Sequence, residues 1–281
     1  MKKLMIFSLV FLVACGVPSA APTATPNELI DEKGISMRVV PAGEFRMGSE
    51  HGEEDESPVH RVYLDAFYMD IYEVTNVSFA ACVKDGGCYP PQNKSSHTRP
   101  DYYGNPEFDN YPVIYMSGYK AEEYCKWRGG RLPTEAEWEK AARGANGFTY
   151  PWGDTTDGTK LNFCDRNCTL SSSDQDMDDG YADTAPVGSY ESGTSPYGMY
   201  DMAGNVWEWV ADSYDAAYYQ TSPLSNPLGP DLDDHRVLRG GSWSDTIDFT
   251  RSTTRKSYFY NYYPDSIYSR FGFRCARSAK P

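Results

Sequence analysis

The cysteines carry the most distinctive chemistry in this chain. Seven are present, and six of them lie between residues 82 and 275. Thiolates bind soft metals such as copper(I), whereas thiols that pair in an oxidising compartment form disulfides. Two pairs are close enough in the sequence to close small local rings, which leaves the remaining two for each other. The sequence therefore predicts three disulfides, Cys82 with Cys88, Cys164 with Cys168, and Cys125 with Cys275.

Four histidines offer weaker grounds for a metal centre. An iron oxygenase of the facial-triad type needs two histidines and a carboxylate. No two of the four histidines form a close metal-binding pair, and His60 lies in an apolar context, Ser-Pro-Val-His-Arg-Val, that favours a half-buried, hydrogen-bonded side chain. The sequence therefore makes no prediction about iron binding. The four histidines, among which we identify no iron site, are His51, His60, His97 and His235.

Carboxylates in polar loops suggest a hard cation instead. Calcium binds carboxylate, amide and main-chain oxygens supplied by loops. The acidic run 174–180 superficially resembles an EF-hand, but Gly180 comes one position late and Ala185 stands where the closing glutamate belongs. We therefore interpret Asp174 and Asp176 as part of a solvated acidic loop.

Two arginines beside glycines, Arg131 and Arg239, could in principle contact phosphate. The chain lacks a Gly-x4-Gly-Lys-Ser/Thr pattern, so we expect these arginines to form salt bridges or to bind main-chain groups. The formal net charge of −14 also excludes a nucleic-acid partner, because neutralising phosphates needs a basic face.

Short strands and helices must position these residues. Alternating apolar and polar residues predict extended segments at 37–40, 43–48 and 62–69. We expect one helix to start at Thr75, a second to cover 120–128, and a third to begin at the capping box Thr134-Glu-Ala-Glu and end at Gly144. Beyond this glycine regular periodicity fades, so composition indicates an irregular, loop-rich α+β domain.

The beginning of the chain indicates export. Two lysines precede an apolar run, 4–14, that is too short to cross a bilayer. The run ends in Leu-Val-Ala-Cys, which resembles the lipobox of bacterial lipoproteins. We therefore expect residues 1–14 to be a signal peptide and Cys15 to carry the lipid.

Three segments follow from this interpretation. Residues 15–34 lack an apolar period, which predicts a disordered tether, and residues 35–281 remain for a single domain. The expected location is a bacterial membrane, with the domain anchored through Cys15 and facing the periplasm or the cell exterior.

Seven motifs, in order, resemble those of the formylglycine-generating enzyme, or sulfatase-modifying factor, family. The resemblance implies a single irregular domain similar to the C-type lectin fold, and it agrees with a long-range disulfide between Cys125 and Cys275. The motifs are 40–48 (Val-Pro-Ala-Gly-Glu-Phe-Arg-Met-Gly), 72–76 (Tyr-Glu-Val-Thr-Asn), 130–139 (Gly-Arg-Leu-Pro-Thr-Glu-Ala-Glu-Trp-Glu), 150–154 (Tyr-Pro-Trp-Gly-Asp), 198–209 (Gly-Met-Tyr-Asp-Met-Ala-Gly-Asn-Val-Trp-Glu-Trp), 239–243 (Arg-Gly-Gly-Ser-Trp) and 272–275 (Gly-Phe-Arg-Cys).

The resemblance also implies a chemistry that this sequence departs from. The best-known members use copper and dioxygen to oxidise a sulfatase cysteine to formylglycine, while relatives include iron-dependent sulfoxide synthases and binding proteins. Their two copper cysteines correspond here to Asp245 and Thr250. Oxygen ligands of this kind bind copper(I) poorly, so we expect no copper-dependent formylglycine generation.

Calcium is the cofactor that the resemblance favours. Motif matching implies two sites, each built from side-chain and main-chain oxygens of a loop. The first set is Asn162, Phe163, Asp179 and Tyr181, and the second is Asp201, Gly204, Val206 and Glu208.

The sequence therefore favours a calcium-stabilised binding or accessory module on a lipoprotein, with a peptide, protein or glycan ligand. The rival hypothesis is a metal-dependent oxidoreductase of the same family acting on a protein or thiol substrate. The aromatic stretch 258–263 could line a groove for such a ligand, although loop packing explains such residues more often. The expected cleft is formed by Trp207, Ser242, Trp243, Asp245 and Arg274.

Overall fold

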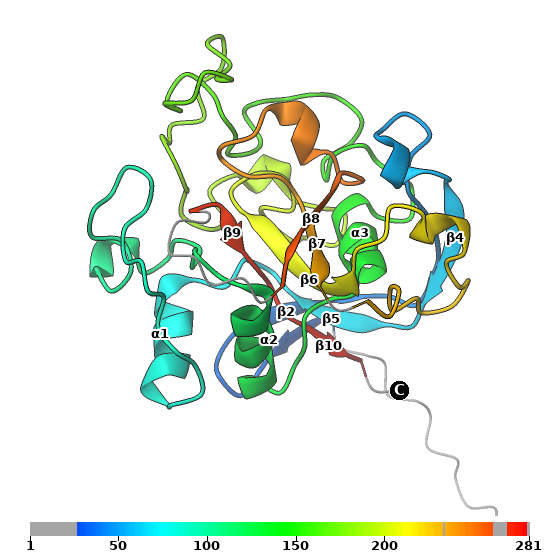
Figure 1. The fold of residues 1–281 in the computed structure, drawn as a ribbon, viewed down its shortest axis with the longest axis horizontal. Helices are drawn as coiled ribbons and strands as arrows, with labels where there is room; N and C mark the ends of the chain where they lie inside the picture. Colours follow the sequence, from blue (N-terminus) through cyan, green and yellow to red (C-terminus); the bar gives the residue numbers. More distant parts are fainter. Residues whose placement is uncertain (1–26, 233, 261–268, 280–281) are drawn as a thin grey trace, which may run out of the picture.

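The computed structural model describes residues 27–232, 234–260 and 269–279. The predicted signal peptide and Cys15 lie outside these residues. Two four-stranded sheets and one two-stranded sheet are surrounded by helices and long loops (Figure 1). The fold is a mixed, loop-rich α+β domain, as predicted.

The first sheet has the order β1-β2-β5-β10 and is antiparallel throughout. It combines the beginning of the described chain with its end. Its strands are β1 (Glu28–Ile30), β2 (Ser36–Val40), β5 (Phe67–Asp70) and β10 (Ala276–Ser278).

The predicted tether is wrong over its last part, because β1 lies within it. Next to β1, Asp31 is buried and forms an ion pair of 2.7 Å with Arg128. Arg128 also binds Asp70 in β5 at 2.7 Å. Because the buried guanidinium of Arg128 is paired with both carboxylates, this segment is part of the domain. The domain therefore begins before Ile35.

The segment 62–69, predicted as one extended stretch, is divided between two sheets. Its first part belongs to β4 (His60–Leu64), which pairs with β3 (Gly43–Met47), and its second part is β5. The chain changes sheet at Asp65, whose main-chain N–H donates to the side chain of Asn226. A contact this distant in sequence is invisible to local alternation.

The third sheet, of order β8-β7-β6-β9, is the largest difference from the sequence prediction, which found no regular periodicity beyond Gly144. Strand β6 is buried at all positions but one, and β7 and β8 place arginine and lysine among apolar residues, so these strands lack the usual alternating pattern. The strands are β6 (Trp207–Ser213), β7 (His235–Arg239), β8 (Arg255–Phe259) and β9 (Phe271–Gly272).

Helix prediction was more accurate. Thr75 caps α1 (Asn76–Lys84), and α2 (Gly118–Trp127) begins two residues before the predicted start. The capping box of α3 (Glu135–Arg143) is present, with Thr134 and Glu137 bonding reciprocally. Five 3-10 helices complete the elements: η1 (Glu54–Glu56), η2 (Pro106–Phe108), η3 (Glu191–Gly193), η4 (Tyr218–Gln220) and η5 (Ile247–Thr250).

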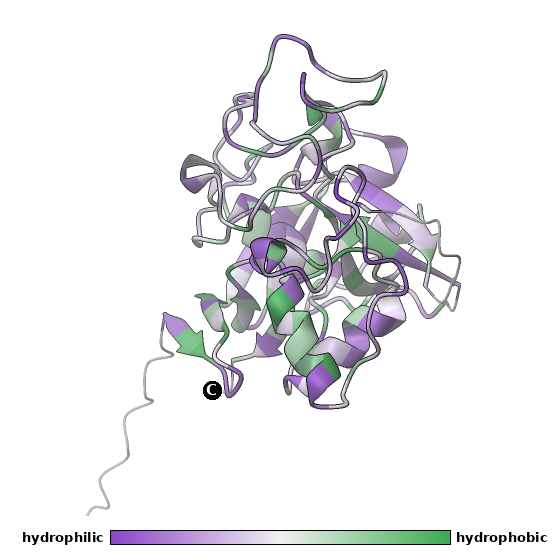
Figure 2. Cartoon of the chain, turned by 90° about the vertical axis from the view of Figure 1, so that its left-hand side faces the viewer, coloured by the Kyte–Doolittle hydropathy of each residue, from purple (hydrophilic) through white to green (hydrophobic). Residues whose placement is uncertain are grey.

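Two large apolar clusters form the core. One lies around Trp138 of α3 and the strands β3 and β4, and the other around Trp207 and Trp209 of β6 and the helices α1 and α2. The helices in Figure 2 accordingly carry both hydrophobic and hydrophilic residues. In the part of the chain that the structure describes, no helix is long and apolar enough to span a membrane.

All three predicted disulfides are present. The bridge between Cys125 and Cys275 joins α2 to the residue that precedes β10, across 150 positions of sequence. Closing so long a loop restricts the unfolded chain by an amount worth about 5 kcal/mol at most.

Candidate functional site

The residues at the copper-cysteine positions lie in a turn that follows β7. Gly240 and Gly241 have positive φ angles of 96° and 76°. A Cβ at Gly241 would lie 2.8 Å from the side chain of Thr250, so glycine lets the turn pack directly on η5. Asp245 lies in the segment that joins this turn to η5, and Thr250 is the last residue of η5.

Neither side chain presents sulfur, and both are engaged internally. The Asp245 carboxylate accepts hydrogen bonds from the Trp207 indole N–H, at 2.8 Å, and from the Ser242 hydroxyl. Thr250 is fully buried, and its hydroxyl donates to the main-chain oxygen of Ile247 at 2.7 Å. Such an arrangement orders the turn but offers no soft ligand.

A shallow depression of about 370 Å³ opens beside this turn. Trp243 and His97 form its aromatic wall, with ring centroids 5.1 Å apart. The Trp243 indole N–H donates to the main-chain oxygen of Ser269, and His97 is hydrogen-bonded through Nε2 to the Thr169 hydroxyl at 2.8 Å. Hydroxyls and a guanidinium complete the lining, which is formed by Ser96, His97, Tyr115, Leu170, Trp243, Ser244, Ser269 and Arg270.

The predicted cleft is only partly correct. Trp243 lines the depression, but Asp245 does not, and Trp207 and Ser242 are fully buried and bonded to Asp245. Arg274 does not belong to it, because its guanidinium is completely buried and forms a double hydrogen bond with Glu208, each at 2.7 Å. The sequence motif identified a structural arginine rather than a ligand contact.

The first predicted calcium set comes together in the structure. The Asp179 carboxylate accepts main-chain N–H bonds from Phe163 and Tyr181, at 2.9 and 2.8 Å. Asn162 is buried, and its side-chain oxygen has no hydrogen-bond partner. Burial raises the pKa of Asp179 to about 7, and the neighbouring Asp165 carboxylate adds to the shift. Carboxylate and amide oxygens are the kind of ligand that a hard cation takes, although the Asn162 amide nitrogen is bonded to Asp183 and Asn205 rather than to Asp179.

The second set does not fit a cation as it stands. Asp201 and Gly204 adopt positive φ angles of 58° and 79° and form a tight loop. Both carboxylate oxygens of Glu208 already accept hydrogen bonds. One accepts from Arg274 and from the Trp138 indole N–H, and the other accepts from Arg274. Main-chain N–H of Val206 points to another carboxylate, Glu73, at 3.2 Å. The guanidinium of Arg274 supplies the positive charge here.

Two carboxylates of these regions escaped the sequence analysis. Asp165 is fully buried and accepts the main-chain N–H of Asp179. Glu73 is buried close to Asp201 and Glu208, and burial followed by their charges raises its pKa well above the usual range. Glu73 lies within a family motif and could have been noticed there, whereas Asp165 lies in no motif. Across the described ranges, no three acidic, histidine or cysteine side chains form a metal-binding group.

The two arginines beside glycines have the structural roles predicted for them. Arg239 is fully buried, binds Glu139 at 2.6 Å and donates to main-chain oxygens of residues 252–254. Arg131 makes two bonds of 2.6 Å to Glu137. In the aromatic stretch, Tyr258 packs on Phe271 at 5.4 Å, and residues 261–263 lie outside the described part.

The sequence matches a known protein family over nearly its whole length. The model of the sulfatase-modifying factor enzyme 1-like domain matches residues 23–279. The chain belongs to this family. The match covers the sheet that combines both ends of the described chain and the whole Asp245 region, so all described residues lie within the sulfatase-modifying-factor domain.

Relatives of this domain differ in function. The formylglycine-generating enzyme of Streptomyces coelicolor is 34% identical, over 95% of this chain and 97% of that protein. An inactive Cα-formylglycine-generating enzyme 2 from Bos taurus is 32% identical, over 90% of this chain and 91% of that protein. The serine/threonine-protein kinase Pkn1 of Chlamydia trachomatis is 37% identical over 91% of this chain, which spans only 39% of that kinase.

A solved structure supports the fold. PvdO from Pseudomonas aeruginosa superimposes with a TM-score of 0.71 and 25% identity, over 92% of this chain and all of that chain. The sulfatase-modifying-factor fold is therefore established, while the relatives include both active and inactive proteins.

Proposed function

We propose that this protein is an exported lipoprotein whose sulfatase-modifying-factor domain binds a peptide or glycan and does not generate formylglycine. The observation that carries the proposal is the replacement of both copper cysteines by Asp245 and Thr250, together with the pairing of all six domain cysteines in disulfides. Copper(I) therefore lacks the thiolates that it prefers.

The depression beside Trp243 is the binding site in this proposal. An aromatic wall stacks against sugar rings or planar side chains, and the surrounding hydroxyls with Arg270 supply hydrogen bonds that fix orientation. A volume of about 370 Å³ suits a single sugar or side chain rather than a whole macromolecule. The ligand would thus be recognised by one protruding group.

Calcium has a structural role in the proposal. Asn162, Asp179 and the main-chain oxygens of Phe163 and Tyr181 would hold the ion, and the loop they order lies beside the site, since Cys164 N–H donates to the main-chain oxygen of Asp245 at 2.9 Å. Calcium would stabilise this loop without taking part in chemistry.

The rival proposal, a metal-dependent oxidoreductase, rests on the identity with the Streptomyces enzyme over nearly its whole length. One assay separates the two. The purified protein is incubated with a thiol peptide from a sulfatase, with copper or iron, and the aldehyde product is measured by mass spectrometry. We expect no aldehyde, and conversion of the peptide would establish the oxidoreductase.

A gain-of-function variant sharpens this test. Replacing Asp245→Cys and Thr250→Cys together restores the two thiols, so copper(I) binding should rise from undetectable to stoichiometric after mild reduction. The matched control, Thr246→Cys with Asp248→Cys, places two thiols on the same segment. Equal copper binding by control and variant would show that the two family positions have no special role.

Anchoring is tested separately. We expect Cys15→Ser to release the protein from the membrane fraction, and the wild-type N-terminal peptide to carry a lipid by mass spectrometry. Recovery of wild-type protein in the soluble fraction with an unmodified cysteine would contradict the lipoprotein assignment.

A further inference from the structure

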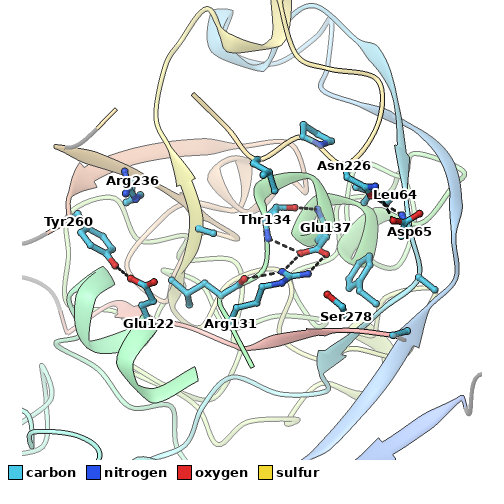
Figure 3. Close-up of a pocket in the computed structure, with 17 residues that line it drawn as sticks. Leu64, Asp65, Glu122, Arg131, Thr134, Glu137, Asn226, Arg236, Tyr260 and Ser278 are labelled. Atoms are coloured by element: carbon cyan, nitrogen blue, oxygen red, sulfur yellow. Dashed lines mark hydrogen bonds and ion pairs between the residues drawn. The ribbon is translucent and has the colours of Figure 1, made fainter. Parts of the chain in front are cut away.

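A second groove is distinct from the Trp243 depression and shares no lining residue with it. It encloses about 730 Å³, within the range of about 300–1,000 Å³ typical of ligand sites. It lies between strand β10, the N-terminal end of α3, the end of β4 and the loop around Asn226 (Figure 3). Four lining residues belong to the motif 130–139, but none of the metal or cleft positions expected from the sequence lies in this groove.

The floor of the groove is apolar. Leu64, Phe67, Leu132 and Ala211 contribute to it, and Leu228 at its rim has 74% of its surface exposed. Ala211 is the only exposed residue of β6. The floor can therefore accept a bulky aliphatic or aromatic side chain, whose burial is favourable in proportion to area.

One side of the groove is a sheet edge. Strand β10 is the last strand of its sheet, and on its outer side Ala276 exchanges two main-chain hydrogen bonds with Arg131, at 2.8 and 3.0 Å. Main-chain groups of alternate residues point to the same side of a strand, so those of Ser278 also point outward. Ser278 lines the groove. An extended peptide can continue the ladder there, as in other cases of strand addition.

The charges at the Asp65 end of the groove favour a basic ligand. Arg131 is bonded to Glu137 and to the main-chain oxygen of Leu132. At the other end, Glu122 pairs with Lys126 at 2.6 Å, and Arg236 donates to Ser213 and to the main-chain oxygen of Leu232. Asp65, at the opposite end from Glu122 in Figure 3, hydrogen-bonds Asn226 and pairs with no lysine or arginine of the described residues. Within a chain of net charge −14, this carboxylate attracts a cation.

We propose that this groove binds an extended peptide segment that carries an aliphatic or aromatic residue next to a lysine or arginine. The peptide main chain pairs with Ser278, its apolar side chain covers Phe67 and Leu132, and its cationic group reaches Asp65. The site is independent of the proposed function at Trp243 and gives the protein a second contact with another polypeptide.

Phage display of random linear peptides, each about seven residues long, provides the test. The library is panned on the full chain, and enriched sequences are measured as synthetic peptides by fluorescence anisotropy. We expect an apolar residue beside a basic one, and binding that Ala211→Trp weakens at least tenfold by filling the floor. Asp65→Asn should weaken the same peptides about three- to tenfold and should spare versions in which norleucine replaces the lysine.

The matched control is Ala216→Trp, which adds the same side chain at an exposed position outside the groove. Its thermal unfolding and that of Ala211→Trp report whether either variant is misfolded, and His97→Ala tests independence from the Trp243 depression. Enriched peptides that bind Ala211→Trp as tightly as wild type, or an absence of enrichment, would overturn the proposal. So would binding of a fluorescent fatty acid or self-association abolished by Ala211→Trp, which would assign the groove to an acyl chain or a second copy.

Discussion

The loop around Asp179 and the start of β6 each contain a buried or half-buried carboxylate, but the two carboxylates have different partners. In β6, Glu208 receives two hydrogen bonds from the fully buried guanidinium of Arg274. In the other region, Asp179 accepts main-chain N–H groups of Phe163 and Tyr181, and the side-chain oxygen of Asn162 has no partner. The internal arginine thus balances the charge of Glu208, whereas Asp179 forms no ion pair with a basic side chain of the described residues.

The largest expected change in stability follows from removing the buried guanidinium of Arg274. Arg274→Met leaves Glu208 buried without its cation, which should lower the free energy of unfolding by about 3–5 kcal/mol. Urea denaturation measures this change. The double variant Arg274→Met with Glu208→Leu should recover most of it, because an apolar pair carries no desolvation penalty.

Calcium provides the informative control for that variant. If the Arg274 guanidinium takes the place of a calcium ion beside Glu208, then the Arg274→Met variant should bind a second calcium ion. Isothermal titration calorimetry should show two sites in the variant and one in the wild type. Two equivalent sites in the wild type would remove the contrast between the loops.

A third buried carboxyl, Asp212, has neither an arginine bonded to it nor an unpartnered amide oxygen nearby. Burial raises its pKa to about 8, with the charges of Glu135 and Glu137 contributing and Arg255 opposing. The folded protein therefore keeps this proton up to a higher pH than the unfolded chain, so stability falls as the pH rises between about 4 and 8. The slope approaches 1.4 kcal/mol per pH unit.

Asp212→Asn should remove this slope, so that the variant gains about 2.7 kcal/mol relative to wild type between pH 5 and pH 7. The asparagine can still accept the Glu135 N–H that Asp212 accepts at 2.7 Å. Denaturant midpoints at several pH values give the comparison, and a slope unchanged in the variant would assign the titration to another group.

Calcium binding to the Asp179 loop should have a smaller effect. At free calcium ten times the dissociation constant, the expected stabilisation is about 1.4 kcal/mol. It should vanish in Asp179→Asn and on adding a chelator, as measured by the unfolding temperature. A chelator that leaves the wild-type unfolding temperature unchanged would argue that the loop takes no ion.

The smallest effect concerns the acidic run itself. Asp176 is exposed and only its main chain bonds locally, so Asp176→Ala should change the calcium dissociation constant less than about twofold. A larger loss would mean that the run contributes ligands directly and that its interpretation as a solvated loop is wrong.

Local patterns predicted local structure well and distant pairings poorly. The capping box at Thr134 needs only neighbouring residues, and the disulfides could be paired by elimination, so both were predicted correctly. Strands β6 to β8 were missed, because Trp207 and Arg239 face the interior through partners elsewhere in the chain. For the same reason Arg274 was assigned to the cleft, although it is a buried partner of Glu208.

In the candidate site too, local sequence predicted the residues of one turn but not their distant neighbours. Of the residues expected in the cleft, Trp243 lines the depression, on a short turn that follows two glycines. His97 was named in the sequence only as a histidine without a pair, and its place against Trp243 depends on a loop that no local signal describes. Sequence predicts which residues a turn displays, while opposing walls of a site come from the fold.

The first sheet has a consequence for how the protein is made. Its order β1-β2-β5-β10 joins strands from residues 28–70 with a strand at 276–278, and the bond between Cys125 and Cys275 fastens the same edge. The sheet cannot be completed until the last strand has been synthesised. The first three strands must therefore wait for the fourth, and oxidation of Cys275 can follow only when nearly the whole domain has been made.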